Sequence, residues 1–186
     1  MFQVRAGDVV PTPWRNRRGR TRELLAQPAG PDWTIRVSMA DIDTDGPFSA
    51  FPGIERWFAV VEGAGVMLDL AGDEQRVALG DPPFRFDGAA APGCTLLSGP
   101  VRDFNLMVRG AVGVMRVVQG GVIWYEPLQQ RGLFTRCAGR WEGGDGGSCP
   151  LAAETLLFDL PDAPGRFVPD GQGPCGWWLG TSVVAA

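Results

Sequence analysis

Short segments of alternating hydrophobic and polar residues, separated by turns rich in glycine and proline, run through this 186-residue chain. Residues 33–40 show the alternation most strictly, with hydrophobic side chains at Trp33, Ile35, Val37 and Met39. A period of two residues places one set of side chains in a core and the other on the opposite face of a strand. With 27 glycines, 16 prolines and few helical periodicities, the chain is predicted to be all-β, a sandwich or a barrel.

The same pattern predicts strands along the whole chain, at residues 2–10, 21–26, 33–40, 55–61, 66–70, 75–79, 84–86, 94–97, 101–109, 112–118, 122–125, 133–136, 156–160 and 176–179. Residues 139–147, the most glycine-rich run, are predicted to form an exposed and mobile loop. Two strand-rich parts, roughly 1–110 and 111–186, are expected to share one core without a linker.

Residues 45–56 (DGPFSAFPGIER) combine a Gly-Pro pair with a Pro-Gly pair. Proline fixes φ and restricts the residue before it, whereas glycine reaches positive φ without steric cost. We therefore predict a stiff double turn that holds Phe48 and Phe51 inward and delivers Glu55 and Arg56 to the next strand. A well-packed connection with a surface ion pair is the alternative interpretation.

Composition excludes several kinds of site, because the chain has no histidine. Histidine general bases, Ser-His or Cys-His dyads and imidazole-rich metal centres are therefore ruled out. None of the four cysteines (Cys94, Cys137, Cys149 and Cys175) stands in C-x-x-C spacing, so we expect reduced thiols rather than a zinc knuckle or redox motif.

Charge and hydropathy point to a cytoplasmic protein. The net charge of −4 and a pI near 4.8 argue against nucleic-acid partners and against anionic membranes. The N-terminus lacks an apolar signal core, and no run of 18 apolar residues could cross a bilayer.

Two polar stretches are candidates for a binding site. Trp14, Arg15 and Asn16 offer a flat apolar face, a forked cation and an amide, and can form one wall of a pocket. In the strand 101–109, Asp103 and Asn105 share one face, which suits a barrel interior that holds a polar ligand. The alternatives are an arginine-rich solvated loop for the first stretch and structural caps of neighbouring loops for the second.

Three stretches resemble one family, HutD/Ves. Residues 14–24 (WRNRRGRTREL) are similar to its W-K-N-G-G-G-x-T-x-E-I signature, and residues 33–56 to its W-R-I-S-x-A…D-G-P-F-S-x-F-P-G-x-D-R block. Residues 99–107 (GPVRDFNLM) resemble its G-x-x-x-D-F-N-L-M element. Order and spacing agree over residues 1–110, and the D-G-P-F-S-x-F-P-G block is highly specific.

The resemblance implies a cupin-like, two-lobed β-barrel (a bicupin of RmlC-like jelly rolls), with no metal and no cofactor. Residues 1–186 would form a single HutD-like unit, with cupin-like lobes at 1–110 and 111–186. The resemblance also implies a regulatory accessory of histidine utilisation that binds a small acidic metabolite, such as a formylated or imidazole-derived acid. Ves-type members are linked instead to stress responses.

The chain departs from the family pattern at three places. Arg15 replaces a lysine and can still bind an anion with forked geometry. Glu55 replaces an aspartate. Arg17 and Arg18 replace glycines and lack their easy access to positive φ, which weakens the expectation of a close backbone approach to ligand there.

The favoured hypothesis is a non-enzymatic protein that binds a small carboxylate, with no catalytic residue. Arg15 or Arg56 would grip the carboxylate, while aromatic side chains supply apolar walls. We expect a small organic acid as the partner, and the sequence leaves a homodimer open. The candidate ligand-binding residues are Trp14, Arg15, Asn16, Glu23, Phe48, Arg56, Asp103 and Asn105.

Two other functions stay open from the sequence. A metal-free isomerase, epimerase or lyase would use Glu23 or Asp103 as its base, because burial can raise a carboxyl pKa into the useful range. A protein-interaction module would use Trp141, Trp177 and Trp178 as anchors, although core packing explains such tryptophans equally well.

Overall fold

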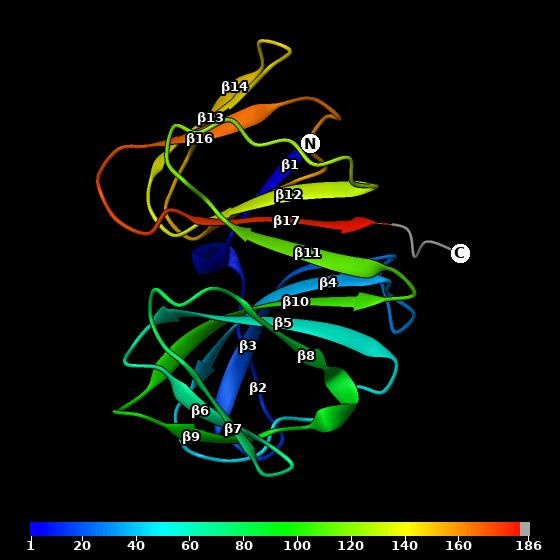
Figure 1. The fold of residues 1–186 in the computed structure, drawn as a ribbon, viewed down its shortest axis with the longest axis vertical. Helices are drawn as coiled ribbons and strands as arrows, with labels where there is room; N and C mark the ends of the chain where they lie inside the picture. The colour runs from blue at the N-terminus through cyan, green and yellow to red at the C-terminus, as the bar shows by residue number, and fades with distance from the viewer. Residues whose placement is uncertain (183–186) are drawn as a thin grey trace. The chain divides into compact units, whose positions relative to one another are not determined.

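A computed structural model describes residues 1–182, and these form β-strands with two short 3-10 turns, Ala6–Asp8 and Gly88–Ala90 (Figure 1). The chain divides into two compact units. One is Val10–Gly113, called here the central unit; the other joins Met1–Val9 to Val114–Ala186 and is called the terminal unit. Within residues 1–182, no helix has the length and hydrophobicity needed to span a bilayer.

The central unit contains two antiparallel sheets. The larger has the strand order β2-β3-β4-β10-β5-β8, and the smaller has the order β7-β6-β9. Their bounds are β2 Thr12–Pro13, β3 Gly19–Gln27, β4 Ile35–Ile42, β5 Ile54–Glu62, β6 Val66–Leu70, β7 Asp73–Val77, β8 Phe84–Asp87, β9 Gly93–Leu96 and β10 Val101–Arg109.

The two sheets of the central unit enclose a hydrophobic core. Alternation along the strands sends every second side chain inward, so that Phe58 and Val60 of β5 meet Leu68 of β6. Burying such side chains contributes about 1.5–3 kcal/mol each. The remaining core members are Ile42, Val66, Val77, Phe86, Cys94 and Val101. This core fills part of the space between the sheets, and the site described below lies on the same inward face.

The terminal unit also contains two antiparallel sheets. The larger has the order β1-β15-β12-β17-β11, and the smaller has the order β14-β13-β16. Their bounds are β1 Phe2–Arg5, β11 Val112–Val117, β12 Gln130–Thr135, β13 Gly139–Gly143, β14 Ser148–Leu151, β15 Thr155–Phe158, β16 Gly165–Pro169 and β17 Gly176–Ser182.

Tryptophans supply much of the interior of the terminal unit. Trp141, Trp177 and Trp178 are all at least 96% buried. Trp178 stacks on Trp124 with ring centroids 4.7 Å apart, and Trp177 stacks on Phe134. The three tryptophans considered as anchors for a protein partner are therefore packed inside the structure.

The prediction of a mobile loop at residues 139–147 was wrong for its first half. Residues Gly139–Gly143 form β13, which pairs with β14 and β16 and buries Trp141. A Cβ on Gly139 would lie 2.5 Å from the carbonyl oxygen of Val168 and 2.6 Å from the ring of Phe167. Glycine is present there because two backbones approach closely, which composition alone does not distinguish from flexibility.

Three further differences separate prediction from structure. The strand predicted at residues 2–10 ends at Arg5 and continues as the 3-10 turn. Residues 122–125 make only an isolated bridge between Trp124 and Gly165. The strands β2, β14 and β16 were not predicted. Each of the three is short and contains or flanks proline, so pairing rather than local pattern defines it.

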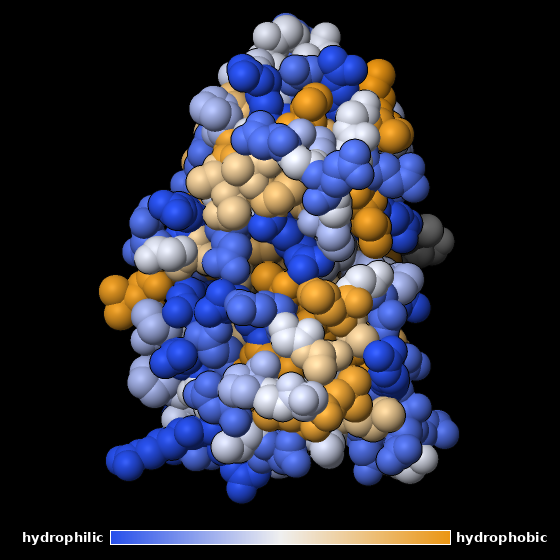
Figure 2. All heavy atoms as spheres, turned by 90° about the vertical axis from the view of Figure 1, so that its left-hand side faces the viewer, coloured by the Kyte–Doolittle hydropathy of each residue, from blue (hydrophilic) through white to orange (hydrophobic). Residues whose placement is uncertain are grey.

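On the face shown in Figure 2, hydrophobic residues form several separate patches among hydrophilic ones. The most exposed large hydrophobic side chains are Val10 and Ile123. Scattered exposure of this kind is normal for a folded protein. The four cysteines are free thiols.

Candidate functional site

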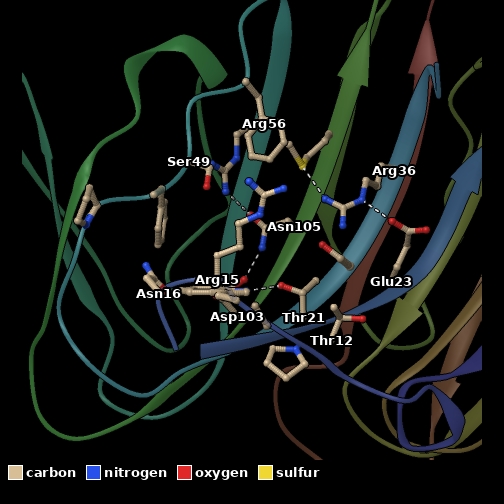
Figure 3. A pocket seen from close by; sticks show the side chains of 18 residues that line it. Thr12, Arg15, Asn16, Thr21, Glu23, Arg36, Ser49, Arg56, Asp103 and Asn105 are labelled. Carbon is tan, nitrogen blue, oxygen red and sulfur yellow. Dashed lines mark hydrogen bonds and ion pairs between the residues drawn. The ribbon is translucent and has the colours of Figure 1, made fainter. Parts of the chain in front are cut away.

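A cavity of about 670 Å³ opens in the central unit (Figure 3). Its lining comes from the inward face of the large sheet, from the loop between β2 and β3, and from the turn at residues 45–56. The structure brings together all eight residues singled out from the sequence: Trp14, Arg15, Asn16, Glu23, Phe48, Arg56, Asp103 and Asn105.

Strand β10 forms the polar floor of the cavity. Asp103, Asn105 and Met107 point inward, whereas the intervening Phe104 and Leu106 are buried on the other face. The sequence predicted this alternation. The register places Asn105 opposite Ser38 of β4 and Met107 opposite Arg56 of β5, so polar groups of three strands converge.

Asn105 links two buried charged groups. Its Oδ1 accepts a hydrogen bond of 3.0 Å from Nη2 of Arg56. Its Nδ2 donates to Oδ1 of Asp103. Arg56 is only 6% exposed and Asp103 only 1%. Buried polar side chains are stable only with such partners, so these three residues act as one polar unit.

The guanidinium of Arg56 is surrounded by aromatic rings. Its Cζ lies 5.2 Å from the ring centroid of Phe48, 5.5 Å from that of Phe51 and 5.0 Å from that of Phe86. The faces of these rings attract a cation. Burial lowers the pKa of Arg56 to about 10. The attraction of Asp103 acts to raise this pKa, and the charge of Arg36 acts to lower it further. Arg56 therefore stays charged at neutral pH.

Two nitrogens of Arg56, Nε and Nη1, are buried without a hydrogen-bond partner. A buried donor left unsatisfied costs about 1–3 kcal/mol, and more when it is charged. A negatively charged group in the cavity would be attracted to this guanidinium, because Arg56 is one of the lining residues. The buried end of the cavity therefore has the chemistry of an anion site.

Asp103 has an unusual acidity for an aspartate. Burial raises its pKa to about 7, although Arg56 and the hydrogen bond from Asn105 both act to lower it, and Asp41 adds slightly to the increase. At neutral pH the carboxyl is close to half-protonated, so it can accept or release a proton with little cost.

Arg36 is a wall residue that was not named from the sequence. Its Nε donates to Oε2 of Glu23 at 2.7 Å, and its Nη1 lies 3.7 Å from Sδ of Met107. The signal was present, since strict alternation at residues 33–40 puts Arg36 and Ser38 on the polar face. Other lining residues not predicted are Thr12, Pro13, Thr21, Ala40, Pro47 and Ser49.

The β2–β3 loop supplies the mouth of the cavity. Nε1 of Trp14 donates to Oγ1 of Thr21 at 2.7 Å, which fixes the plane of the indole. A Cβ on Gly19 would lie 3.0 Å from that indole, so glycine makes room for it. Arg15 and Asn16 are exposed, and Oδ1 of Asn16 accepts from the amide of Arg18 at 3.0 Å.

Residues 6–123 match the family model described as HutD. The chain belongs to the HutD family. A protein of Pseudomonas putida described as an uncharacterized 21.2 kDa protein in the hutC 3′ region is 38% identical over 108 residues, covering 56% of each chain. Protein Ves of Citrobacter koseri is 39% identical over 98 residues, covering 52% of this chain and 51% of Ves. The chain spans about half the length of the curated relatives it matches.

Two solved structures are similar to this HutD-family chain over 99% of both lengths. A conserved protein of unknown function from Pseudomonas aeruginosa has a TM-score of 0.85 and 26% identity. HutD from Pseudomonas fluorescens, described under a formate condition, has a TM-score of 0.83 and 27% identity.

More distant structures share the fold alone. Oxalate decarboxylase from Bacillus subtilis has a TM-score of 0.66 at 10% identity, and the Escherichia coli protein Ylba has a TM-score of 0.70 at 10% identity. The predicted all-β, cupin-like, two-lobed fold is confirmed for this HutD-family chain.

The departures from the family pattern have local explanations. Arg17 takes the left-handed conformation, with φ of 57°, although it is not glycine. Nη1 of Arg18 donates to the carbonyl oxygen of Asp45, which ties the β2–β3 loop to the turn at 45–56. Glu55 does not line the cavity; it accepts hydrogen bonds from Nε1 of Trp57 at 2.9 Å and from the amide of Gly113 at 2.8 Å.

Among the residues that the structure describes, no group of three or more acidic or cysteine side chains is placed to hold a metal ion. The polar groups of the cavity are guanidiniums, carboxyls, amides and hydroxyls. Such a lining can bind an anion through Arg56 and can exchange a proton through Asp103.

Proposed function

We propose that the cavity of this HutD-family chain binds a small organic acid, with the carboxylate held by Arg56. The observation that carries the proposal is a buried guanidinium, with two unpartnered nitrogens, in the lining of a cavity of about 670 Å³. A carboxylate accepts hydrogen bonds from a guanidinium with matching planar geometry. Phe48 and Trp14 add apolar walls, as is usual in small-molecule sites.

We propose further that binding is non-enzymatic and that the protein is a regulatory accessory of histidine catabolism. Support comes from the family name and from the Pseudomonas putida relative, which is described by its position next to hutC. The solved HutD is described under a formate condition, and formate is the simplest carboxylate. A stress-related role is the alternative that the Ves-named relatives suggest.

A thermal-shift screen followed by calorimetry tests binding directly. We expect urocanate, formylglutamate or formate to raise the melting temperature, since a ligand that binds only the folded state stabilises it. Arg56→Gln should weaken binding roughly tenfold or more, because hydrogen bonds to charged groups are worth about 1.5–3 kcal/mol. Arg76→Gln removes an exposed arginine outside the cavity and should leave affinity unchanged.

The position of Asp103 favours a second candidate function, metal-free proton-transfer catalysis. Its pKa near 7 suits a general base, and Arg56 beside it could stabilise a developing negative charge. Glu23 is less suited, because it is half exposed and paired with Arg36. Asp103→Asn should then abolish turnover while ligand binding survives. An absence of turnover across a panel of small acids would leave the binding function alone.

A further inference from the structure

Five titratable side chains line the cavity: Arg15, Arg36, Arg56, Glu23 and Asp103. Arg36 and Glu23 neutralise each other, since Nε and Oε2 are 2.7 Å apart. The other three side chains are two guanidiniums, Arg15 and Arg56, and one carboxyl, Asp103. The cavity carries an excess of one positive charge when Asp103 is ionised and of two when it is protonated.

The two uncompensated arginines lie at different depths. Arg56 is almost fully buried among phenylalanine rings, whereas Arg15 is exposed in the β2–β3 loop. Figure 3 shows both side chains reaching into the cavity from different elements. No hydrogen bond or ion pair joins Arg15 to another described residue, and Arg56 keeps two unpartnered nitrogens. Each arginine is free to take its own anionic group.

An aromatic residue accompanies each of the two arginines. The ring of Phe48 packs against the Arg56 guanidinium, and Trp14 directly precedes Arg15 with its indole held by Thr21. Both rings line the cavity. A one-carbon acid at Arg56 would leave these rings and most of the 670 Å³ to water. A longer molecule could satisfy the buried arginine, cover the rings and reach the mouth.

We propose that the ligand is an organic dianion with two carboxylates joined by a short, largely apolar spacer. One carboxylate would bind Arg56 at the buried end, and the other would bind Arg15 at the mouth. This inference rests on the proposed function, because it presupposes that the cavity binds a carboxylate at all. Beyond the proposed function, it specifies how many charges the ligand carries and gives Arg15 a role separate from that of Arg56.

Calorimetry with matched acids provides the test. The series from malonate to adipate is compared at neutral pH with the half-amide of each acid, which keeps the length and loses one charge. For at least one length we expect the dicarboxylate to bind roughly tenfold or more tightly than its half-amide. Arg15→Gln should remove this advantage and leave the half-amide affinity unchanged. Arg56→Gln should weaken both ligands.

Arg17→Gln is the matched control, because it removes the same charge from the same loop at a residue that does not line the cavity. It should preserve the advantage of the dicarboxylate. The inference is overturned if half-amides bind as tightly as dicarboxylates at every length, or if Arg15→Gln weakens both ligands equally or neither. If monocarboxylates bind and a second carboxylate adds no affinity, only this inference is contradicted. If no acid binds at all, the proposed function is contradicted as well.

Discussion

Asn105 joins Arg56 to Asp103 by using both ends of its amide, with Oδ1 accepting from Arg56 and Nδ2 donating to Asp103. The arrangement fixes the orientation of the amide, since the reverse orientation would face donor with donor and acceptor with acceptor. It also holds a cation and an acid inside the central unit without leaving the amide unsatisfied. The geometry of the buried end of the cavity depends on this one side chain.

Replacing Asn105 with leucine should destabilise the protein by about 3 kcal/mol, because the change leaves both a buried guanidinium and a buried carboxyl without a partner. Urea denaturation measures the loss. Asn16→Leu is the control, since Asn16 is exposed and makes one hydrogen bond to the Arg18 amide; it should cost at most about 1 kcal/mol. A loss at Asn105 no larger than that at Asn16 would contradict the bridging role.

The acidity of Asp103 predicts a pH dependence of stability. Unfolding returns its pKa from about 7 to an ordinary value near 3.8. Between these values the folded state binds more protons, so the stability that protonated Asp103 contributes is complete below pH 4 and is lost as pH rises through 7.

Asp103→Asn removes this titration. Between pH 5 and pH 8 the wild type should lose roughly 2–4 kcal/mol of stability relative to Asp103→Asn, as measured by urea unfolding at both pH values. Asp43→Asn, at an exposed aspartate, should track the wild type instead. Parallel pH profiles for the wild type and Asp103→Asn would contradict the raised pKa.

Asp41 shows the opposite dependence. The residue is 6% exposed, and its carboxylate accepts from Nε of Arg20, Nη1 of Arg22 and Nε of Arg102 at 2.7–2.8 Å. Although burial acts to raise it, these hydrogen bonds hold the pKa of Asp41 well below its usual range. Stability from this group is present above its ordinary pKa near 3.8 and is lost as pH falls below that value.

Asp41→Asn should therefore lower stability at neutral pH by about 3 kcal/mol, since three arginines lose a buried charged partner. Thermal unfolding at neutral pH and near pH 3 measures the effect, which should shrink at the acidic pH. Asp69→Asn, at an exposed residue of the same unit, serves as the control. An effect of equal size at both pH values would show that shape rather than charge explains the loss.

Glycine at position 139 tests the corrected view of residues 139–147. Gly139→Ala should destabilise by about 2 kcal/mol, because the new methyl group would press on the Val168 carbonyl and the Phe167 ring. Gly171→Ala meets open space and should change stability by less than about 0.5 kcal/mol. Urea denaturation measures the free energy of unfolding of both variants. Equal, small effects would contradict the close packing of Gly139 and favour a mobile loop at residues 139–147.

Local pattern predicted the fold where each strand has two distinct faces. Strand β10 was predicted with its observed bounds because polar and apolar residues alternate along its length. The turn at 45–56 was also predictable, since proline fixes φ and glycine permits positive φ whatever surrounds them. The inward placement of Asp103 and Asn105 followed from the same alternation.

Pairing between distant segments was not predictable in this way. The first strand pairs with β15, with Phe2 opposite Phe158, so the chain's beginning joins the terminal unit. No local feature of residues 2–5 indicates that partner. Strands β14 and β16 likewise exist because they flank β13. Their sequences, SCPL and GRFVP, do not alternate clearly.

The candidate site was partly predictable for a related reason. Arg36 was not among the predicted site residues. Alternation along a strand does not distinguish an arginine in a cavity wall from one on a solvent-facing surface. Its role depends on Glu23 and Met107, which lie on two other strands. Likewise, the aromatic surroundings of Arg56 include Phe86 of β8, a residue that the sequence places in an unrelated strand.

A crystal structure of the protein with its tightest-binding small acid tests the central claim most directly. The account predicts a ligand carboxylate within about 3 Å of a guanidinium nitrogen of Arg56, with the Asn105 bridge to Asp103 intact. An acid bound elsewhere on the molecule, or held in the cavity with its carboxylate turned away from Arg56, would contradict it.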